Sequence, residues 1–289
     1  MVYYYTNTLK LLIMIIAENV HFSYSRKKPL FKDLNLSLKK NKIYGLLGRN
    51  GMGKSTLMKL LAGFLPAKEG KLKVGAYNPI HRETRFMENI FFLNEDFDLP
   101  AISLSNYEKA YSGFYPKFDQ EKFHAILTEF EVPRDQKLTK LSYGQKKKII
   151  IAFGIATNVD YVFLDEPTNG LDIPSKSQFR KLLAKNFSEN QSIIISTHQI
   201  RDLANLLDSI IIIDNGEIQL SMDLGQIEDK LLFATYKLDD QSPIYSEMHA
   251  GGSIHIYPNL EKCDSQIEIE TFFNAFIAQP QIILNTLNA

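Results

Sequence analysis

One short segment carries the residue types and the spacing that bind phosphate. Residues 48–56 read GRNGMGKST and match the pattern G-x-x-x-x-G-K-[ST]. The three glycines allow the backbone to fold so tightly that successive N–H groups point at one anion. Lys54 would then reach the outer phosphates, and the hydroxyl of Ser55 would ligate Mg²⁺. The residues expected to hold a magnesium-bound nucleoside triphosphate are Gly48, Asn50, Gly51, Gly53, Lys54, Ser55 and Thr56.

Two adjacent carboxylates could complete the chemistry of phosphate hydrolysis. The apolar run YVFL ends in Asp165 and Glu166, and PTNGLD follows. Because ligands bind at the carboxyl ends of buried parallel strands, both side chains are expected beside the nucleotide. Asp165 would hold Mg²⁺ through its water shell, and Glu166 would polarise the water that attacks the terminal phosphate. An acidic turn after a strand would explain one carboxylate, but not the following PTNGLD.

The elements around these residues are a strand and a helix in the order that a phosphate loop needs. Residues 43–47 (IYGLL) read as a short buried strand, and residues 56–62 (TLMKLLA) place apolar side chains at helical spacing. This setting favours a phosphate loop over an ordinary glycine-rich turn.

Other apolar runs predict the sheet that holds these groups. Residues 34–38 (LNLSL) alternate like a half-buried strand. Continuous apolar runs of the kind buried on both faces of a parallel sheet occur at 161–164, 192–195 and 210–213. Asn215-Gly216 then predicts a tight hairpin and an antiparallel edge strand. The predicted fold class is therefore α/β, with a mixed sheet.

A helical region interrupts the strand pattern. Strand signals vanish between about residues 99 and 157, where charged helix formers such as those in 119–130 carry apolar residues at helical spacing. We expect a helical subdomain over about 97–157, inserted into a sheet domain that covers 14–225.

The pattern changes again after Gly225. Apolar residues return in three segments, which are 227–236, 253–257 and 266–276. They predict a small α/β appendage in a C-terminal accessory region, residues 226–289, whose task the sequence leaves open.

The amino terminus contains a short apolar run. Residues 11–17 (LLIMIIA) are too few to span a membrane, which takes about 20 apolar residues, and a small-residue cleavage site is missing. We expect residues 1–13 to be an appendage or a misassigned start, with Met14 as the true start and residues 1–12 disordered.

The bulk composition limits the partners. The chain has 289 residues with 33 basic and 33 acidic side chains, so its net charge of zero offers no general attraction for nucleic acid or anionic lipid. The single cysteine, Cys263, excludes an internal disulfide and fits a reducing cytosol. Six scattered histidines suggest no metal cluster.

With these motifs in order, the chain resembles the ATP-binding subunit of an ABC transporter over about residues 15–222. Residues 141–145 (LSYGQ) match the signature of that family. The resemblance implies a P-loop NTPase core of ABC ATPase type, with an antiparallel β subdomain and an inserted α-helical subdomain. It also implies that the signature faces the ATP of a second subunit through Ser142, Gly144 and Gln145. A plain helix cap is the alternative for this segment.

Three further assignments rest on the resemblance. His198 follows a buried strand, where family members carry a switch histidine that contacts the terminal phosphate; a satisfied polar residue is the alternative. Residues 169–172 (NGLD) would cross to the partner subunit. Tyr24, expected in a strand, would stack on adenine, unless it is a surface tyrosine beside Arg26 and Lys27.

Two positions depart from the family pattern. Tyr143 places a bulky ring beside the expected phosphate contact of the signature. Glu95 occupies the place of the usual glutamine after a strand, where it could ligate Mg²⁺ but adds negative charge beside the phosphates. The lysines at 146–148 are expected to form a solvated helix face rather than a nucleic-acid patch.

The resemblance implies an ATPase subunit that dimerises around two Mg-ATP and drives transport by a permease on a separate chain. The second ATP-binding subunit would be a copy of this chain or a paralogue. The spacing around residues 115–133 (YPKFDQEKFHAILTEFEVP) and the presence of a tail after the core resemble subunits of the smaller two-component, often export-type, systems. The expected location is peripheral on the cytoplasmic face of the cell membrane, and nucleic acid is not expected as a partner. A soluble ABC-type ATPase acting on nucleic acid or the ribosome and a regulatory ATP-binding module are the alternatives.

Overall fold

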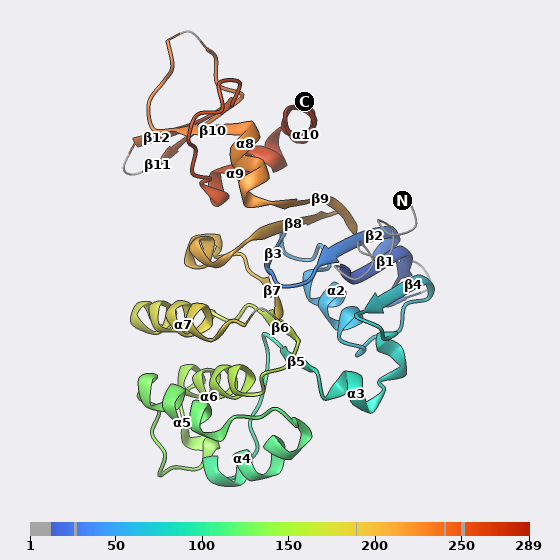
Figure 1. Ribbon diagram of the computed structural model, residues 1–289, viewed down its shortest axis with the longest axis vertical. Helices are drawn as coiled ribbons and strands as arrows, with labels where there is room; N and C mark the ends of the chain where they lie inside the picture. The colour runs from blue at the N-terminus through green and yellow to red at the C-terminus, as the bar shows by residue number, and fades with distance from the viewer. Residues whose placement is uncertain (1–12, 26–27, 189, 240, 250–251) are drawn as a thin grey trace, which may run out of the picture.

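The computed structural model describes residues 13–25, 28–188, 190–239, 241–249 and 252–289. A central sheet separates two hydrophobic cores, and the C-terminal region continues beyond one edge of that sheet (Figure 1). The expectation that residues 1–12 are disordered lies outside the described residues. None of the helices among the described residues is both long and apolar enough to cross a membrane.

Six strands form the central sheet in the order β5-β6-β7-β3-β8-β9. The neighbours from β5 to β8 are parallel, whereas β9 is antiparallel to β8. Both residues of the Asn215-Gly216 turn have positive φ, 49° and 77°, which matches the twist of a tight hairpin. Every position of β3 and β7 is buried, as their continuous apolar runs predict. The strands are β3 (Ile43–Leu47), β5 (Ile90–Leu93), β6 (Tyr161–Asp165), β7 (Ser192–Ser196), β8 (Ser209–Asp214) and β9 (Glu217–Asp223).

One face of the central sheet packs on helix α2 (Lys54–Leu61) and on a second, antiparallel sheet. That sheet has the order β2-β1-β4, with β1 (Ile13–Phe22), β2 (Phe31–Lys39) and β4 (Glu69–Val74). Strand β2 alternates as predicted, and its leucines point into the core while the polar residues between them are exposed. The small helix α3 (Thr84–Met87) connects this part to β5.

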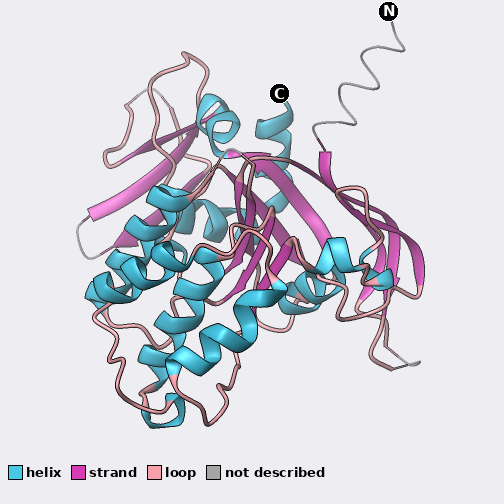
Figure 2. Ribbon diagram, turned by 60° about the horizontal axis from the view of Figure 1, so that its bottom comes forward, coloured by secondary structure: helices cyan, strands magenta, loops and turns pink. Residues whose placement is uncertain are grey.

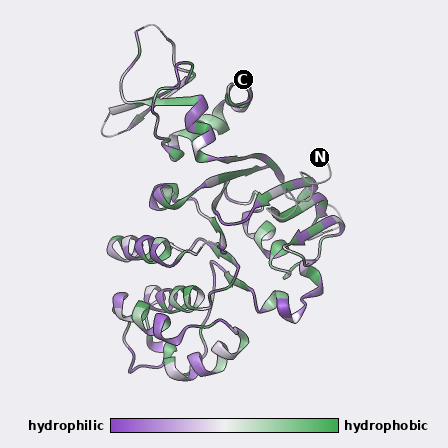
Figure 3. Cartoon of the chain, viewed as in Figure 1, coloured by the Kyte–Doolittle hydropathy of each residue, from purple (hydrophilic) through white to green (hydrophobic). Residues whose placement is uncertain are grey.

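Helices cover the opposite face (Figure 2). Residues 97–157 are all described and form helices and turns without a strand, as the sequence predicted. The limits of this subdomain stay a prediction. Its helices are α4 (Leu104–Tyr111), α5 (Gln120–Glu129) and α6 (Tyr143–Ala156), and α7 (Ile173–Asn186) follows β6. The apolar strands lie between these layers, and the polar residues lie toward the outer surfaces of the helices (Figure 3).

The short helical turns connect these elements. They are η1 (Pro79–His81), η2 (Ser112–Phe114), η3 (Leu138–Lys140), η4 (Ile200–Asp202) and η5 (Ala204–Leu206).

The C-terminal region is a small α/β unit, as predicted, but it has more elements than the sequence indicated. Its antiparallel sheet has the order β10-β12-β11. Neither the mostly polar β11 nor the terminal α10 was predicted from the apolar segments of the sequence. The elements are α8 (Leu224–Lys230), β10 (Leu231–Ala234), β11 (Tyr245–His249), β12 (Gly252–Pro258), α9 (Ile269–Ala278) and α10 (Pro280–Asn288).

This region packs directly on the part of the chain that forms the central sheet. Ile227 and Phe272 are buried in the same hydrophobic core as the central sheet. Arg201, three residues after His198, forms an ion pair with Glu270 of α9 and a 3.2 Å hydrogen bond with His249 of β11. The accessory region is therefore joined to the segment that follows β7.

Candidate active site

The glycine-rich segment forms a tight loop between β3 and α2. Gly53 precedes the helix with φ 105°, and a Cβ there would come within 2.6 Å of the Phe31 ring. Gly48 lies so close to β8 that a Cβ would meet the Ile213 carbonyl oxygen at 2.5 Å. Both positions therefore require glycine. The loop leaves the amino end of α2, with its free N–H groups and positive dipole, facing the space above it.

Lys54 is folded against the inner side of this loop. Its Nζ donates to the carbonyl oxygen of Gly48 at 2.7 Å and to that of Arg49 at 3.3 Å. Burial lowers the pKa of Lys54, while the negative charges of Glu166 and Asp165 act in the opposite direction. The ammonium group is thus positioned to pair with an anion in the loop.

A cleft of about 510 Å³ opens in front of the loop, which is a size suited to a small-molecule ligand. It brings together most of the residues singled out from the sequence, although they come from separate parts of the chain. Its lining comprises Tyr24, Leu30, Asn50, Gly51, Gly53, Lys54, Ser55, Thr56, Glu95, Asp165, Glu166 and His198.

The two carboxylates lie at the carboxyl end of β6. Asp165 is 1% exposed, and its Oδ1 accepts a hydrogen bond from the hydroxyl of Ser196. Its Oδ2 is buried and has no hydrogen-bond partner within the described part of the chain. A buried carboxylate oxygen in this condition needs a ligand such as a cation or an ordered water.

Glu166 pairs with the histidine predicted from the next strand. The Nδ1 atom of His198 lies 2.9 Å from Oε1 of Glu166, and the backbone N–H of His198 is 3.4 Å from Oε2. Glu166 adopts φ 46°, a left-handed conformation that is uncommon outside glycine. A carboxylate held in this way beside the cleft can act as a base toward a water.

Glu95 follows β5 and also reaches the cleft. Its Oε1 accepts a 2.9 Å hydrogen bond from Nδ2 of Asn169, whose Oδ1 lies 3.4 Å from Nε2 of Gln199. The loops after β5, β6 and β7 are thus connected by side-chain hydrogen bonds at one edge of the sheet.

The residues present fit a magnesium ion that is held mainly by a bound nucleotide. Mg²⁺ in nucleotide sites takes one or two carboxylates and fills its remaining positions with phosphate oxygens and water. Asp165 with its unpartnered oxygen, Glu95 and the Ser55 hydroxyl would be its protein ligands. In the described residues, no three His, Cys, Asp or Glu side chains gather into a site that could hold a metal unaided.

Tyr24 lies at the mouth of the cleft rather than in a strand. The prediction of a strand at this position was wrong, because β1 ends at Phe22 and the chain then bends. The Tyr24 hydroxyl is 2.9 Å from Oγ1 of Thr56, and its ring contacts Phe22 edge-on with centroids 4.9 Å apart. The ring is 67% exposed, so one of its faces is free to stack on a planar base.

Known proteins resemble this chain in sequence and in fold. The family described as ABC transporter matches residues 31–169. The energy-coupling factor transporter ATP-binding protein EcfA1 of Fusobacterium nucleatum is 31% identical over 218 residues, which cover 71% of this chain and 81% of that protein. The chain belongs to the ABC transporter ATP-binding family. It is an ATPase of that family, as the sequence predicted.

Other relatives agree with this assignment. The cobalt import ATP-binding protein CbiO of Salmonella paratyphi A is 28% identical to the ABC ATPase, over 74% of this chain and 82% of that protein. A solved structure of the ATP binding subunit of an ABC transporter has a TM-score of 0.67 at 19% identity, covering 74% of this chain and 92% of that one. A likeness at this identity establishes the fold, and the predicted fold class is confirmed.

The signature of the ABC ATPase begins helix α6 outside the cleft. Ser142 is the N-cap, and its Oγ accepts from the backbone N–H of Gln145 at 3.2 Å. The Gln145 side chain accepts in turn from the N–H of Ser142 at 2.9 Å, which completes a capping box. The helix-cap alternative therefore describes the local structure. Ser142, Gly144 and Gln145 do not line the nucleotide cleft of their own subunit.

Tyr143 of the ABC ATPase is held by its own subunit. Its hydroxyl donates to the carbonyl oxygen of Glu95 at 2.8 Å, and its ring lies 5.1 Å from that of Phe97. A Cβ on Gly170 would approach this ring to 2.6 Å. The bulky ring therefore connects the signature helix to the loop that carries Glu95.

The position of Lys147 differs from the predicted one and places this residue next to Glu166. The lysines at 146–148 were expected to form a solvated helix face, but Lys147 is 0% exposed. Its Nζ donates to the carbonyl oxygen of Glu166 at 2.7 Å. The helical spacing to the buried Ile150 and Ile151, three and four positions later, could have indicated this orientation.

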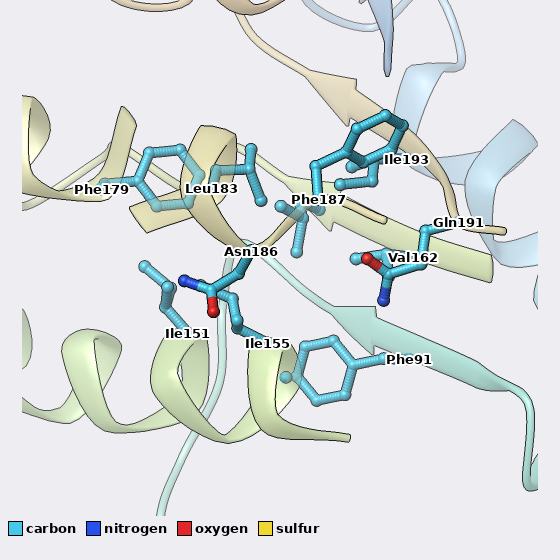
Figure 4. A pocket seen from close by; sticks show the side chains of 12 residues that line it. Phe91, Ile151, Ile155, Val162, Phe179, Leu183, Asn186, Phe187, Gln191 and Ile193 are labelled. Atoms are coloured by element: carbon cyan, nitrogen blue, oxygen red, sulfur yellow. The ribbon is translucent and has the colours of Figure 1, made fainter. Parts of the chain in front are cut away.

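A second hollow of the ABC ATPase is unsuited to chemistry. It lies between α6, α7 and the sheet and is lined mainly by Phe91, Ile151, Phe179 and other apolar side chains (Figure 4). Its volume of about 20 Å³ holds little more than one water. It is a packing gap and not a substrate site.

Proposed function

We propose that this ABC ATPase pairs with a second ATP-binding subunit around two Mg-ATP molecules and drives transport through a permease on a separate chain. The observation that carries the proposal is the separation of the two phosphate-binding elements. Lys54 lies in the cleft, whereas Ser142 and Gly144 lie outside it on the exposed start of α6. A serine and a helix start so placed can cap only the nucleotide of another subunit.

The residues of the cleft have complementary tasks in hydrolysis. Backbone N–H groups of residues 48–56 and the Lys54 ammonium would bind the phosphates. Mg²⁺, when bound, would neutralise charge on the phosphate oxygens, held by Ser55, Asp165 and Glu95. Glu166 would accept the proton of the attacking water, and His198 would orient the Glu166 carboxylate and contact the terminal phosphate.

Turnover and mass measurements test this proposal together. Wild-type protein should hydrolyse ATP, and Lys54→Ala and Glu166→Gln should reduce turnover to the background. Because Glu166→Gln binds ATP but cannot activate water, light scattering should show a doubled mass with Mg-ATP. Ser142→Arg places bulk and charge at the start of α6, so a Glu166→Gln/Ser142→Arg protein should stay monomeric with Mg-ATP.

Two results would contradict the proposal. Equal turnover in the wild type and both single variants would favour the regulatory ATP-binding module. A Glu166→Gln protein that stays monomeric at saturating Mg-ATP, both alone and when co-expressed with the ATP-binding subunits of its own organism, would exclude a second subunit as the source of the cap.

The permease and the location are proposed from the family. Relatives are named for import, as in CbiO, and a structural neighbour is a bacterial Atm1-family ABC exporter with ATP bound (TM-score 0.65, 20% identity, 73% of this chain and 39% of that one). Export therefore stays a prediction from the spacing of residues 115–133 and the presence of the tail. A protein peripheral on the cytoplasmic face should co-purify with a membrane protein and be released with it by detergent. Co-purification with RNA or ribosomes instead would favour the soluble alternative.

A further inference from the structure

A buried lysine links the signature helix to the catalytic glutamate. Lys147 lies in the second turn of α6, is fully buried, and donates from Nζ to the Glu166 carbonyl oxygen at 2.7 Å. The rest of its surroundings is largely aromatic, since Nζ lies 5.4 Å from the centroid of Tyr143 and 5.9 Å from that of Phe97. This contact joins two segments that are 19 positions apart.

Burying an ammonium group costs free energy, so the groups that compensate its charge show what keeps Lys147 in this position. Burial lowers the pKa of Lys147 to about 8, against the opposing charges of Glu95, Glu166 and Asp165. The side chain therefore keeps most of its positive charge at neutral pH. Among these charges Glu95 opposes the lowering of the pKa of Lys147 most, and Glu95 is the residue that this chain has in place of glutamine.

The hydrogen bond from Lys147 is made to a residue, Glu166, whose backbone conformation is uncommon. Glu166 is a left-handed residue, with φ 46°, and its N–H donates to the Ser196 carbonyl oxygen at 3.1 Å. Such conformations persist in residues other than glycine only where the surroundings fix them. Ser196 accepts from the N–H of Glu166, and Lys147 donates to its carbonyl oxygen. Together these hydrogen bonds fix the backbone position from which the Glu166 side chain extends.

We propose that Lys147 is a positioning residue that holds Glu166 in its hydrolytic orientation and makes this orientation depend on the placement of the signature helix. The inference rests on the proposed function, because the start of α6 would cap the nucleotide of the second subunit. Ser142 and Lys147 are five positions apart on one helix, so a movement of the cap also moves the donor to Glu166. When α6 of one subunit caps the nucleotide bound to the second subunit, Lys147 would thereby align Glu166 at the nucleotide bound to the first subunit.

Lys147→Met tests this role, with Lys146→Met as the matched control on the partly exposed neighbouring position. Methionine keeps the bulk but removes the charge and the donor. We expect kcat to fall about tenfold or more, because small displacements of a catalytic group are costly. The KM for ATP and the Mg-ATP-induced dimer of a Glu166→Gln/Lys147→Met protein should be unchanged, and Lys146→Met should match the wild type.

Two further variants separate positioning from folding. Lys147→Gln keeps a donor but loses the charge, so it should retain a higher kcat than Lys147→Met. Should Lys147→Met not fold, Lys147→Leu, which also lacks a donor, takes its place.

The outcomes distinguish this inference from the proposed function. Wild-type kcat in Lys147→Met, or in Lys147→Leu if the methionine variant does not fold, would overturn the positioning role while leaving the ATPase assignment intact. A kcat in Lys147→Gln no higher than in the variant without a donor would overturn the part played by the hydrogen bond to Glu166. Turnover insensitive to Glu166→Gln would instead refute the proposed function itself.

Discussion

The imidazole of His198 and the carboxylate of Glu166 are in contact, with Nδ1 and Oε1 2.9 Å apart, although 32 positions separate them. Strands β6 and β7 are parallel neighbours, and Asp165 pairs with Ser196 at their carboxyl ends. The residues that follow these strands therefore emerge side by side at one edge of the sheet. In the proposed function, the histidine would orient the base and contact the terminal phosphate.

His198→Ala should lower kcat by about 100-fold, the range in which positioned acid–base partners contribute. The KM for ATP should change much less than kcat, because the phosphate loop supplies most of the contacts to the phosphates. Steady-state ATP hydrolysis measures both constants. His81→Ala, on an exposed helical turn, serves as the control. A kcat within twofold of the wild type would remove His198 from the mechanism.

Asp165→Asn should raise the Mg²⁺ concentration for half-maximal turnover by about 10-fold or more, as expected for a change at a metal-holding carboxylate. The physical reason is the buried Oδ2 without a partner, which a neutral amide replaces poorly as a cation ligand. Magnesium titrations at saturating ATP test this expectation. Asp160→Asn, which removes an exposed carboxylate paired with Lys117, should leave the titration unchanged. Identical magnesium dependence in all three proteins would contradict the assignment.

Tyr24→Ala should weaken ATP binding about tenfold, since stacking of a base on an aromatic ring contributes about 1 to 3 kcal/mol. Tyr24→Phe keeps the ring and loses only the partly buried hydrogen bond to Thr56, so its affinity for ATP should stay within about fivefold. Binding of a fluorescent ATP analogue to a Glu166→Gln protein separates affinity from turnover. If alanine and phenylalanine behave alike, the ring does not stack on the base.

Asp223→Asn should destabilise the junction with the C-terminal region. Burial would raise the pKa of Asp223, but hydrogen bonds from Lys42 and Ser209 outweigh this effect and lower the pKa below its ordinary 3.8. A lowered pKa in the folded state means that the stabilisation is present above pH 3.8 and lost as the pH falls through the folded value. At pH 7 we expect a loss of about 1 kcal/mol and about 2 °C in Tm.

The pH dependence provides the check. Thermal unfolding should show a gap between Asp223→Asn and the wild type at pH 7 that narrows below pH 4. Asp229→Asn, exposed in α8, should unfold like the wild type at both pH values. A gap that is constant with pH would show that the carboxylate charge is not the cause.

Local sequence was sufficient for the parts that follow from short-range geometry. Gly48 is required by the close approach of the Ile213 backbone, and Gly53 by its positive φ and the nearby Phe31 ring. Continuous apolar runs form strands buried on both faces. Asn215-Gly216 makes its hairpin because both residues accept positive φ. The polar β11 and the end of β1 at Phe22 were missed, since neither has a signal in an apolar run.

The sequence by itself determined the phosphate loop, the carboxylate pair and the α/β class, because these depend on neighbouring residues and on the periodicity of apolar side chains. Only the tertiary structure decided that Lys147 is buried beneath Glu166, that Tyr143 binds the Glu95 loop, and that His198 contacts the base. Each of these contacts joins residues on different elements, and their distances depend on how the sheet and helices pack.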